Sequence, residues 1–595
     1  MPISRTAILW ALCLFSTSLL YGQAKWSSLD PYGFPISAPG NPQLQADFQT
    51  CKHLLKGQKV VGMGEATHGT REFFQYKHEM MRYLAEELGY RIFAIEGSMP
   101  EAIAVDRFVR FGEGDPAQAI GAMGFWTWNT EEVLEMVLWM REFNKNRSPE
   151  DQIRFVGVDM QSQKTACRDL AEFLEKYAPN PQEELISGLK PFEETYLSFV
   201  SKEEQAEFLV LATQVRDYIH ANQAHWTQKV SEDEWQWIRM ETEVLWQVAH
   251  YPGESMNRTY RDSCMAHNLV DYLEQAGQDA KAFFWGHNGH IKKYEDSLYG
   301  GFRTCGRFLE AEYGEQYLAI GFDFGSGEFV AGGKNGLKVN FHENQSKKGQ
   351  VALGEEKGCD RFFLDLRSAE KDGNCSEVLN ELSPLVSIGS NYDKLYRRNN
   401  HEKAPPHHFY DAVIFISEVT AAKQLRGTAS SYGALRQKWK AKKLKGDRFR
   451  LSAKARVIAS AFGGNGYLQV IQSNPEKFRN PSLIKSAKVN SENEWTSLVA
   501  EGELEPKSTS IIFEFRIQGS IEVELSEMEL EIQRDGKWQV FPLANADFKE
   551  WEGPLPQGWE TNRQDLDILQ SDSSKEVTEP IVLIHWKDHK IPVNR

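Results

Sequence analysis

Between about residues 45 and 425, apolar runs of strand length alternate with segments of helical periodicity, and this alternation restricts the folds open to the chain. The runs are KVVGMG (59–64), RIFAIEG (91–97), IRFVGVD (153–159), KAFFWGH (281–287), YLAIGFD (317–323), RFFLDL (361–366) and AVIFIS (412–417). Continuous apolar runs bounded by polar residues are typical of parallel strands covered on both faces. We therefore expect an α/β fold, a mainly parallel sheet with helices on both faces.

The length of 595 residues predicts more than one domain. Residues 180–277 have an almost wholly helical pattern, which indicates a large helical insertion in an α/β catalytic domain spanning 40–425. Residues 425–446 are rich in Lys, Gly, Ser and Ala and are expected to form a linker. Beyond 447 the apolar residues alternate with period two, which predicts an all-β sandwich over 447–595. This second domain is expected either to contact carbohydrate or to pack on the first.

The first residues resemble a secretory signal. Arg5 precedes an apolar stretch from Ala7 to Leu20, and small or polar residues follow near Gly22. We expect residues 1–24 to be a signal peptide, the protein to be exported to the periplasm or secreted, and the mature chain to have no membrane span. An oxidising compartment permits disulfides, and Cys359 and Cys375 flank a short polar segment and could pair.

The charge argues against one class of partner. The formal net charge is −16, and no block of five or six basic residues occurs. Proteins that bind nucleic acid depend on clustered Lys and Arg for contacts to phosphates. We therefore expect no nucleic-acid partner.

Titratable residues stand where several of the predicted strands end. Glu65 and His68 follow the first strand, Glu96 ends the second, Asp159 ends the third, and His287 and His290 follow the fourth. In an open α/β sheet, ligands bind outside the carboxyl ends of the strands. We expect these side chains to form one functional site at that edge.

Two chemistries can use such a set. In the first, His68 is the general base for an attacking water, held by a neighbouring glutamate. In the second, His287, His290, Glu65 and Glu96 bind a divalent metal such as zinc, which activates the water. A third interpretation is a haem- or metal-binding protein without catalysis, in which the tryptophan-rich "FWTWN" around Trp126 lines a haem pocket instead of an apolar substrate cleft.

At these residues the chain resembles the erythromycin esterase family. The resemblance rests on "GEATHGTREFF", "FAIEGSMPEAIAVDRFV", "GFWTWNTEEVLEMVLWMREFN", "FVGVDMQS", "MNRTYRDSCMAHNL" and "FFWGHNGHI", which occur in family order through roughly residues 45–420. It implies water-mediated opening of a macrolide lactone, or hydrolysis of another ester, without a covalent intermediate and without a cofactor. The expected partner is a small-molecule ester.

The family's motifs also imply roles for individual residues. The general-base histidine falls on His68, the first glutamate on Glu65, the second on Glu96, and the late histidine pair on His287 and His290. A basic residue on the following helix falls on Lys77, where the best-known members carry arginine. The expected catalytic set is His68, Glu65, Glu96 and His287. The expected substrate-binding set is His290, Arg71, Lys77, Trp126 and Asp159.

Overall fold

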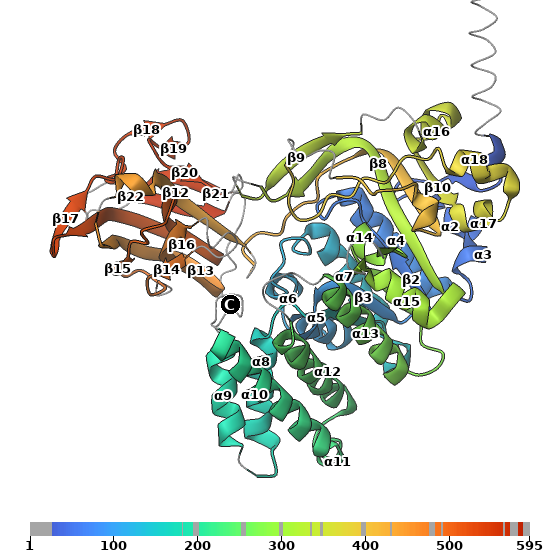
Figure 1. The fold of residues 1–595 in the computed structure, drawn as a ribbon, viewed down its shortest axis with the longest axis horizontal. Helices are drawn as coiled ribbons and strands as arrows, with labels where there is room; N and C mark the ends of the chain where they lie inside the picture. The colour runs from blue at the N-terminus through green and yellow to red at the C-terminus, as the bar shows by residue number, and fades with distance from the viewer. Residues whose placement is uncertain are drawn as a thin grey trace, which may run out of the picture.

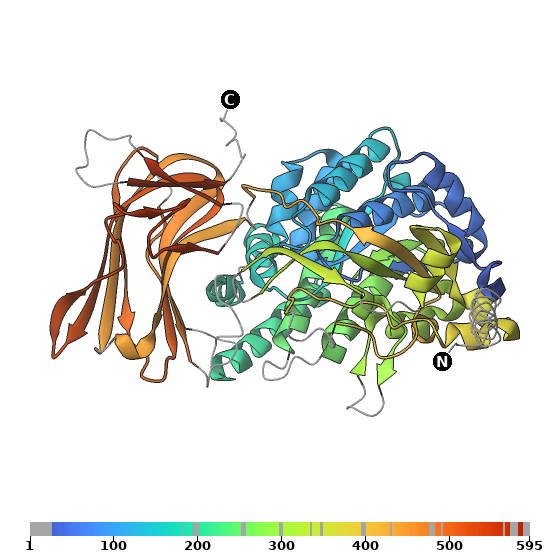
Figure 2. The same ribbon diagram turned by 90° about the horizontal axis from the view of Figure 1, so that it is seen from above.

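The computed structural model describes residues 27–586, with gaps at 181, 194–201, 252–257, 297–301, 334–335, 345–348, 394–399, 429–430, 445, 475–481, 490–491, 563–565 and 572–580. The expected signal peptide therefore lies outside the described residues. Two bodies are visible side by side in both ribbon views, an α/β body and an all-β body (Figures 1 and 2).

The sheet of the α/β body has the strand order β1-β10-β11-β8-β2-β5-β3-β4, with β9 paired to β8. From β11 to β4, all neighbouring strands are parallel, whereas β1, β10 and β9 pair antiparallel. The strands are β1 (Gly33–Pro35), β2 (Val60–Met63), β3 (Ile92–Ser98), β4 (Arg154–Asp159), β5 (Ala282–Trp285), β8 (Tyr317–Ala331), β9 (Lys338–Glu343), β10 (Arg361–Asp365) and β11 (Ala412–Val419). The mainly parallel sheet expected from the sequence is confirmed.

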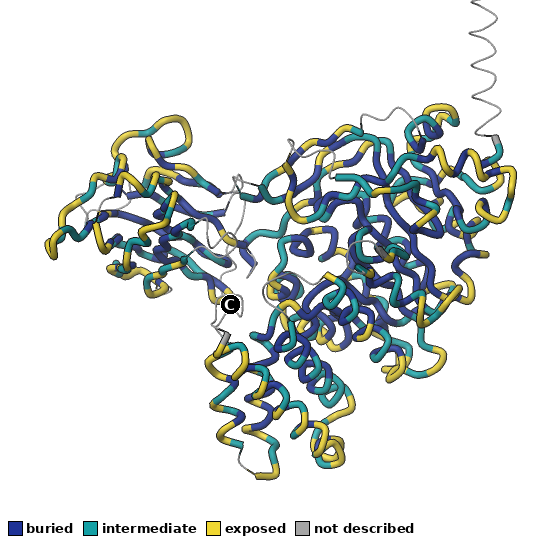
Figure 3. The backbone as a smooth tube through the Cα atoms, in the orientation of Figure 1, coloured by how far each residue is buried: buried dark blue, intermediate teal, exposed yellow. Residues whose placement is uncertain are grey.

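Helices cover both faces of this sheet because successive strand residues point to opposite sides. In β2, Val60 joins one apolar core and Val61 the other. On the Val61 side lie α2 (Gln43–Thr50), α3 (Lys52–Leu55), α4 (Arg71–Glu87), α5 (Met99–Phe111), α6 (Pro116–Ala122) and α7 (Glu131–Asn144). On the Val60 side lie α8 (Lys164–Tyr177), α13 (Arg258–Gln275), α15 (Cys305–Tyr313), α16 (Gln350–Lys357), α17 (Leu366–Glu370) and α18 (Ser376–Leu379). The buried segments of Figure 3 follow the strands between these layers.

The described part of residues 180–277 is helical and lies between β4 and β5. It contains α9 (Glu183–Glu193), α10 (Lys202–Ala221), α11 (Gln223–Trp226) and α12 (Glu232–Ala249), and it ends with α13. In Figure 1 helices α9, α10, α11 and α12 extend away from the sheet. Leu189, Phe208 and Trp226 nevertheless belong to the same apolar core as the strands. Among the described residues, no helix combines the length and apolar character that crossing a bilayer requires.

The all-β body is built on two long antiparallel strands, β13 (Arg448–Ser473) and β16 (Ser510–Arg534). Its other main strands are β12 (Tyr432–Lys440), β14 (Ser482–Lys485), β15 (Thr496–Glu503), β17 (Lys537–Phe541), β21 (Leu566–Ser571) and β22 (Ile581–Trp586). The body also contains three short strands, β18 (Trp551–Glu552), β19 (Leu555–Pro556) and β20 (Glu560–Thr561). Its apolar core is a separate cluster drawn only from residues after 434.

The linker predicted at 425–446 is wrong over much of its length. Residues 432–440 form β12, which pairs with β16 from Tyr432 opposite Gln518 to Lys440 opposite Ser510. Leu435 in this strand is fully buried in the all-β core. Lys438 and Lys440 at the end of this strand are exposed, and Gln437 is a buried polar residue, so composition alone hid the strand.

The domain boundary before β12 can be tested with two shortened chains. A chain ended after Ser431 keeps the contacts of Leu425 and Thr428 with Asn129 and loses the all-β body whole. We expect it to be monomeric and to unfold cooperatively. A chain ended after Gly446 retains β12 without its partner β16, and such an unpaired apolar strand promotes aggregation. Size-exclusion chromatography and thermal unfolding compare the two, and aggregation of the shorter chain alone would contradict the assignment.

The suggested Cys359–Cys375 disulfide is absent, because all described cysteines are free thiols. Cys375 is buried, and its Sγ donates to the Ser28 carbonyl at 3.2 Å. Cys359 ends the turn after α16, where its amide bonds to Gly354. Nearness in sequence therefore does not bring the two thiols together.

Candidate active site

The backbone at Gly64, just after β2, packs closely against Asn288, just after β5. A Cβ on Gly64 would lie 2.1 Å from Asn288 Oδ1, so only glycine fits there. The Asn288 amide donates to the Glu65 carbonyl at 3.0 Å, and the Asn288 side chain bonds both backbone groups of Phe322. The loop carrying Glu65 and His68 and the loop carrying His287 and His290 therefore form one structure.

Glu65 is the buried centre of the first half of the site. Its side chain has no exposed surface, and Oε1 accepts a hydrogen bond from His68 Nδ1 at 2.7 Å. Oε2 accepts from Trp285 Nε1 at 2.8 Å and from the ammonium of Lys77. Burial lowers the pKa of Lys77 to about 8, although Glu65 opposes this shift. Glu65 thus holds His68 as the tautomer with its proton on Nδ1.

His68 presents its other nitrogen to a cleft. The side chain is 12% exposed and stands edge-on to Trp128, with ring centroids 6.0 Å apart. Within the part of the chain that the structure describes, Nε2 has no hydrogen-bond partner. An imidazole with Nδ1 fixed by a carboxylate and Nε2 free is the arrangement of a general base.

Glu96 is the centre of the second half of the site. Oε1 accepts from Arg261 Nη2 at 2.9 Å and lies 3.2 Å from His290 Nε2, while Oε2 accepts from the His287 amide at 2.8 Å. Burial alone would raise the pKa of Glu96, but His290 and Arg261 hold it well below its usual range. Glu96 is therefore ionised and anchors both cations beside the cleft.

Asp262 and Asp159 orient these cations. His290 Nδ1 lies 2.8 Å from Asp262 Oδ1, and Arg261 binds Asp159 through Nε and Nη2. Burial disfavours the charge on His290, but Asp262 and Glu96 raise its pKa above the ordinary value. Burial also disfavours the charge on Arg261, but the carboxylates around it, Asp159 above all, raise its pKa well above the ordinary value. His290 and Arg261 thus form a basic pair, with His290 Nε2 3.2 Å from Arg261 Nη1.

His287 lies between the two halves and is held by backbone. Its Nε2 donates to the Ile388 carbonyl at 3.0 Å, and its Nδ1 accepts from the Gly289 amide at 3.0 Å. Burial and the neighbouring His68 lower its pKa well below the ordinary value, so the ring is neutral. Its ring centroid is 4.7 Å from that of His68. This geometry favours a positioning role over proton transfer.

These groups border a cleft of about 840 Å³. The predicted residues His68, Glu96, Trp126, His287 and His290 line it, as do Arg261 and Asp262. Further lining comes from the loops around 387–390 and 400–403, late in the chain. The structure therefore brings the cluster expected from the strand ends together at one cleft.

Lys77, Asp159 and Arg71, which the sequence predicts as substrate contacts, lie outside the lining of the cleft. Lys77 and Asp159 have no exposed surface, and their polar atoms are already bound to Glu65 and Arg261. Arg71 begins α4 and donates to Glu132 at 3.1 Å, outside the lining of the cleft. Lys77 and Asp159 instead support the residues that reach the cleft.

Arg261, Asp262 and Trp128 also line the cleft, although the sequence patterns do not predict them as site residues. Arg261 and Asp262 are adjacent on α13, on the buried side of a helix in which most buried residues are apolar. Two adjacent charged residues among the apolar buried residues of a helix are the sequence signal that could have identified them. Trp128 donates from Nε1 to the Glu96 carbonyl at 3.1 Å, a contact that no sequence pattern indicates.

The alternative metal site does not fit the side chains present. Among the described residues, no group of three or more His, Cys, Asp and Glu side chains is arranged to hold a metal ion. Both nitrogens of His287 are bound to backbone, and Glu65 is occupied by Lys77, Trp285 and His68. A metal with Glu65, Glu96, His287 and His290 as ligands would require these bonds to break.

The raised pKa of His290 predicts how stability depends on pH. Its contribution to the free energy of unfolding is complete below the ordinary histidine pKa of about 6.5 and is lost as the pH rises through the raised value. Between about pH 6 and about pH 9, the free energy of unfolding of the wild type, measured with urea, should fall more steeply with pH than that of His290→Gln. Parallel curves would contradict the ion pairs of His290.

Solved structures share this fold. A Bacillus cereus protein of 22% sequence identity matches with a TM-score of 0.59, over 68% of this chain and 99% of that chain. A succinoglycan biosynthesis protein matches with a TM-score of 0.58 and 20% identity, over 68% of this chain and 98% of that chain. Both likenesses concern the fold alone.

Sequence relatives point to one family. Erythromycin esterase type II of Escherichia coli is 22% identical over 419 residues, 63% of this chain and 93% of that protein. Putative hydrolase YbfO of Bacillus subtilis is 26% identical over 274 residues, 42% of this chain and 60% of that protein. The sequence model of erythromycin esterase matches residues 85–419. The chain therefore belongs to the erythromycin esterase family.

Proposed function

We propose that the protein is a hydrolase that cleaves a carboxylic ester or lactone by direct attack of water, with His68 as general base. The observation that carries the proposal is the geometry of His68, whose Nδ1 is fixed 2.7 Å from buried Glu65 while Nε2 faces the cleft without a partner among the described residues. Family membership and the names of the sequence relatives, an esterase and a hydrolase, support the same class.

In the proposed reaction, a water in the cleft gives a proton to His68 Nε2 as its oxygen attacks the ester carbonyl carbon. Glu65 stabilises the imidazolium that forms. The tetrahedral intermediate then collapses, the carbon–oxygen bond to the alkoxide breaks, and the alkoxide takes the proton back from His68. The products are an acid and an alcohol, or a hydroxy acid from a lactone, and no bond to the enzyme forms.

The basic pair of His290 and Arg261 has a role in this scheme. Both line the cleft, where Glu96, Asp159 and Asp262 hold them in place. A preorganised positive charge stabilises the oxyanion of an acyl-transfer intermediate. His287 holds the Ile388 carbonyl and keeps the loop at 387–390 against the site.

The lining of the cleft supports a substrate with both apolar and polar surface. Phe125, Trp126, Tyr251 and Tyr294 contribute aromatic rings, while Arg258 and Lys292 contribute charge. A cleft of this size accommodates a macrolide as well as smaller esters. Following the N-terminal pattern, we propose that the enzyme acts outside the cytoplasm.

A substrate panel tests the function. The purified chain is incubated with aryl esters, aliphatic lactones and macrolides of the erythromycin type, and products are identified by mass spectrometry. We expect addition of one water to at least one member, at a rate that His68→Ala removes. Absence of hydrolysis across the panel, or equal hydrolysis by the variant, would contradict the proposal.

A further inference from the structure

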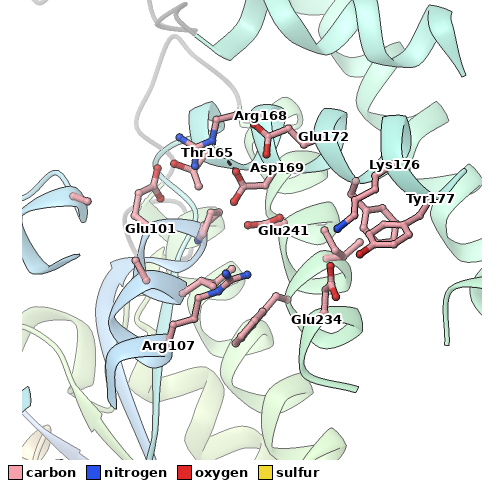
Figure 4. Close-up of a pocket in the computed structure, with 17 residues that line it drawn as sticks. Glu101, Arg107, Thr165, Arg168, Asp169, Glu172, Lys176, Tyr177, Glu234 and Glu241 are labelled. Carbon is pink, nitrogen blue, oxygen red and sulfur yellow. Dashed lines mark hydrogen bonds and ion pairs between the residues drawn. The ribbon is translucent and has the colours of Figure 1, made fainter. Parts of the chain in front are cut away.

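A second cavity, of about 640 Å³, lies between α5, α8 and α12. Its lining shares no residue with the lining of the candidate active site. Carboxyl side chains reach it from all three helices: Glu101 from α5, Asp169 and Glu172 from α8, and Glu234 and Glu241 from α12. Figure 4 shows them around a common space, with Glu241 at its centre pointing toward Asp169.

Glu241 is the unusual member of this set. The Glu241 residue is 1% exposed, and its carboxyl shares a hydrogen bond with Asp169, while Oε2 has no N–H donor beside it among the described residues. A buried carboxyl oxygen without such a donor is costly, so this atom marks a place where an N–H group of a ligand can bind. Burial and the nearby Asp169 raise the pKa of Glu241 well above its usual range.

The basic residues of the cavity already have other partners. Arg168 donates to Asp169 at 2.8 Å, Arg107 lies 4.6 Å from the centroid of the Trp237 ring, and Lys176 lies 4.6 Å from that of Tyr177. No ion pair joins any of these side chains to Glu241 in the described structure. The cavity therefore offers carboxyl oxygens and aromatic faces to a ligand that brings its own positive charge.

We propose that this cavity binds a small organic cation whose primary ammonium or guanidinium group donates hydrogen bonds to Glu241 Oε2 and Asp169. Cations of this kind combine N–H donors with positive charge, and their carbon chains suit the apolar walls formed by Ile103, Phe173 and Ile238. A bare metal ion fits less well, since the described carboxylates include no group arranged as metal ligands.

Binding is coupled to a proton. Glu241 is neutral in the empty cavity, where the groups that influence it most are Asp169, Glu101 and Arg168 on the two facing helices. An arriving cation favours the ionised carboxylate, so Glu241 releases its proton. Glu172, Lys176, Glu234 and Arg107 line the same cavity.

Isothermal titration calorimetry of the full chain tests the proposal, with n-butylammonium, 1,4-diaminobutane and agmatine as probes. We expect at least one to bind and to release a proton, measured as a heat that depends on the ionisation enthalpy of the buffer. Glu241→Gln has the shape of the neutral acid and should keep the fold, by circular dichroism. It should weaken binding about tenfold or more and abolish proton release.

Controls separate this cavity from the active site. The probes should bind His68→Ala as they bind the wild type, whereas Asp169→Asn should weaken binding as Glu241→Gln does. The uncharged isostere n-butanol should not bind. The proposal is overturned if no probe binds, if Glu241→Gln binds as tightly as the wild type, or if Mg²⁺ or Ca²⁺ alone binds in a manner that requires Glu241.

Discussion

Replacing His68 by alanine is expected to lower kcat/KM for ester hydrolysis by roughly two to four orders of magnitude, the usual contribution of a positioned acid–base group. The reason is that Nε2 of His68 faces the cleft with no partner in the part of the chain that the structure describes, while Glu65 fixes Nδ1 at 2.7 Å. Steady-state kinetics on the best ester of the panel measures the effect. Thermal unfolding should change little, because the side chain is partly exposed at the cleft.

A matched control for this variant is His220→Ala. His220 also pairs with a glutamate, at 3.0 Å from Glu243, but it lies on α10, outside the lining of the cleft. It should retain wild-type kinetics. If His220→Ala loses as much activity as His68→Ala, the loss reports general damage to the protein and the assignment of His68 fails.

Glu65→Gln should have the second large effect, on both stability and activity. It leaves the ammonium of Lys77, which has no exposed surface, without its carboxylate, and removing one partner of a buried pair costs roughly 3–5 kcal/mol. The amide also no longer enforces the tautomer of His68, so kcat should fall by roughly two to four orders of magnitude. Urea unfolding and kinetics on the same preparation measure both effects.

The double variant Lys77→Met, Glu65→Gln separates these two effects. Removing both charges should restore much of the stability, because no buried charge is left alone, while hydrolysis remains slow. The exposed pair Glu142 and Lys145 is the comparison, since Glu142→Gln should cost less than about 1 kcal/mol. Recovery of activity in the double variant would show that Glu65 acts only through stability.

The parallel core of the fold could be predicted from sequence because its signal is local. Buried runs such as 60–63 and 412–417 read as strands whatever their neighbours. The edges were harder: β1 has only residues 33–35, and β9 alternates buried and exposed residues without an apolar run. The composition of β12 predicts a linker, because the burial of this strand comes from pairing with β16, far along the chain.

The candidate active site shows the same difference between features with a local sequence signal and features that depend on distant contacts. His68, Glu96 and His290 follow strands, so the sequence alone predicts that they meet at one edge of the sheet. The sequence does not predict which polar atoms of the site are already hydrogen-bonded within the protein. The bonds of Lys77 to Glu65, of Arg261 to Asp159, and of His287 to the Ile388 carbonyl depend on packing between distant segments. Those bonds decide which side chains reach substrate and which support them.

The most direct test of water activation by His68 without a metal is hydrolysis of the best ester after exhaustive dialysis against a strong chelator. Wild type and His68→Asn are compared in the same buffer, with and without added zinc or manganese. The account predicts that the chelated wild type keeps its full rate and that His68→Asn stays slow under every condition. Loss of the wild-type rate on chelation, restored by zinc or manganese, would contradict it.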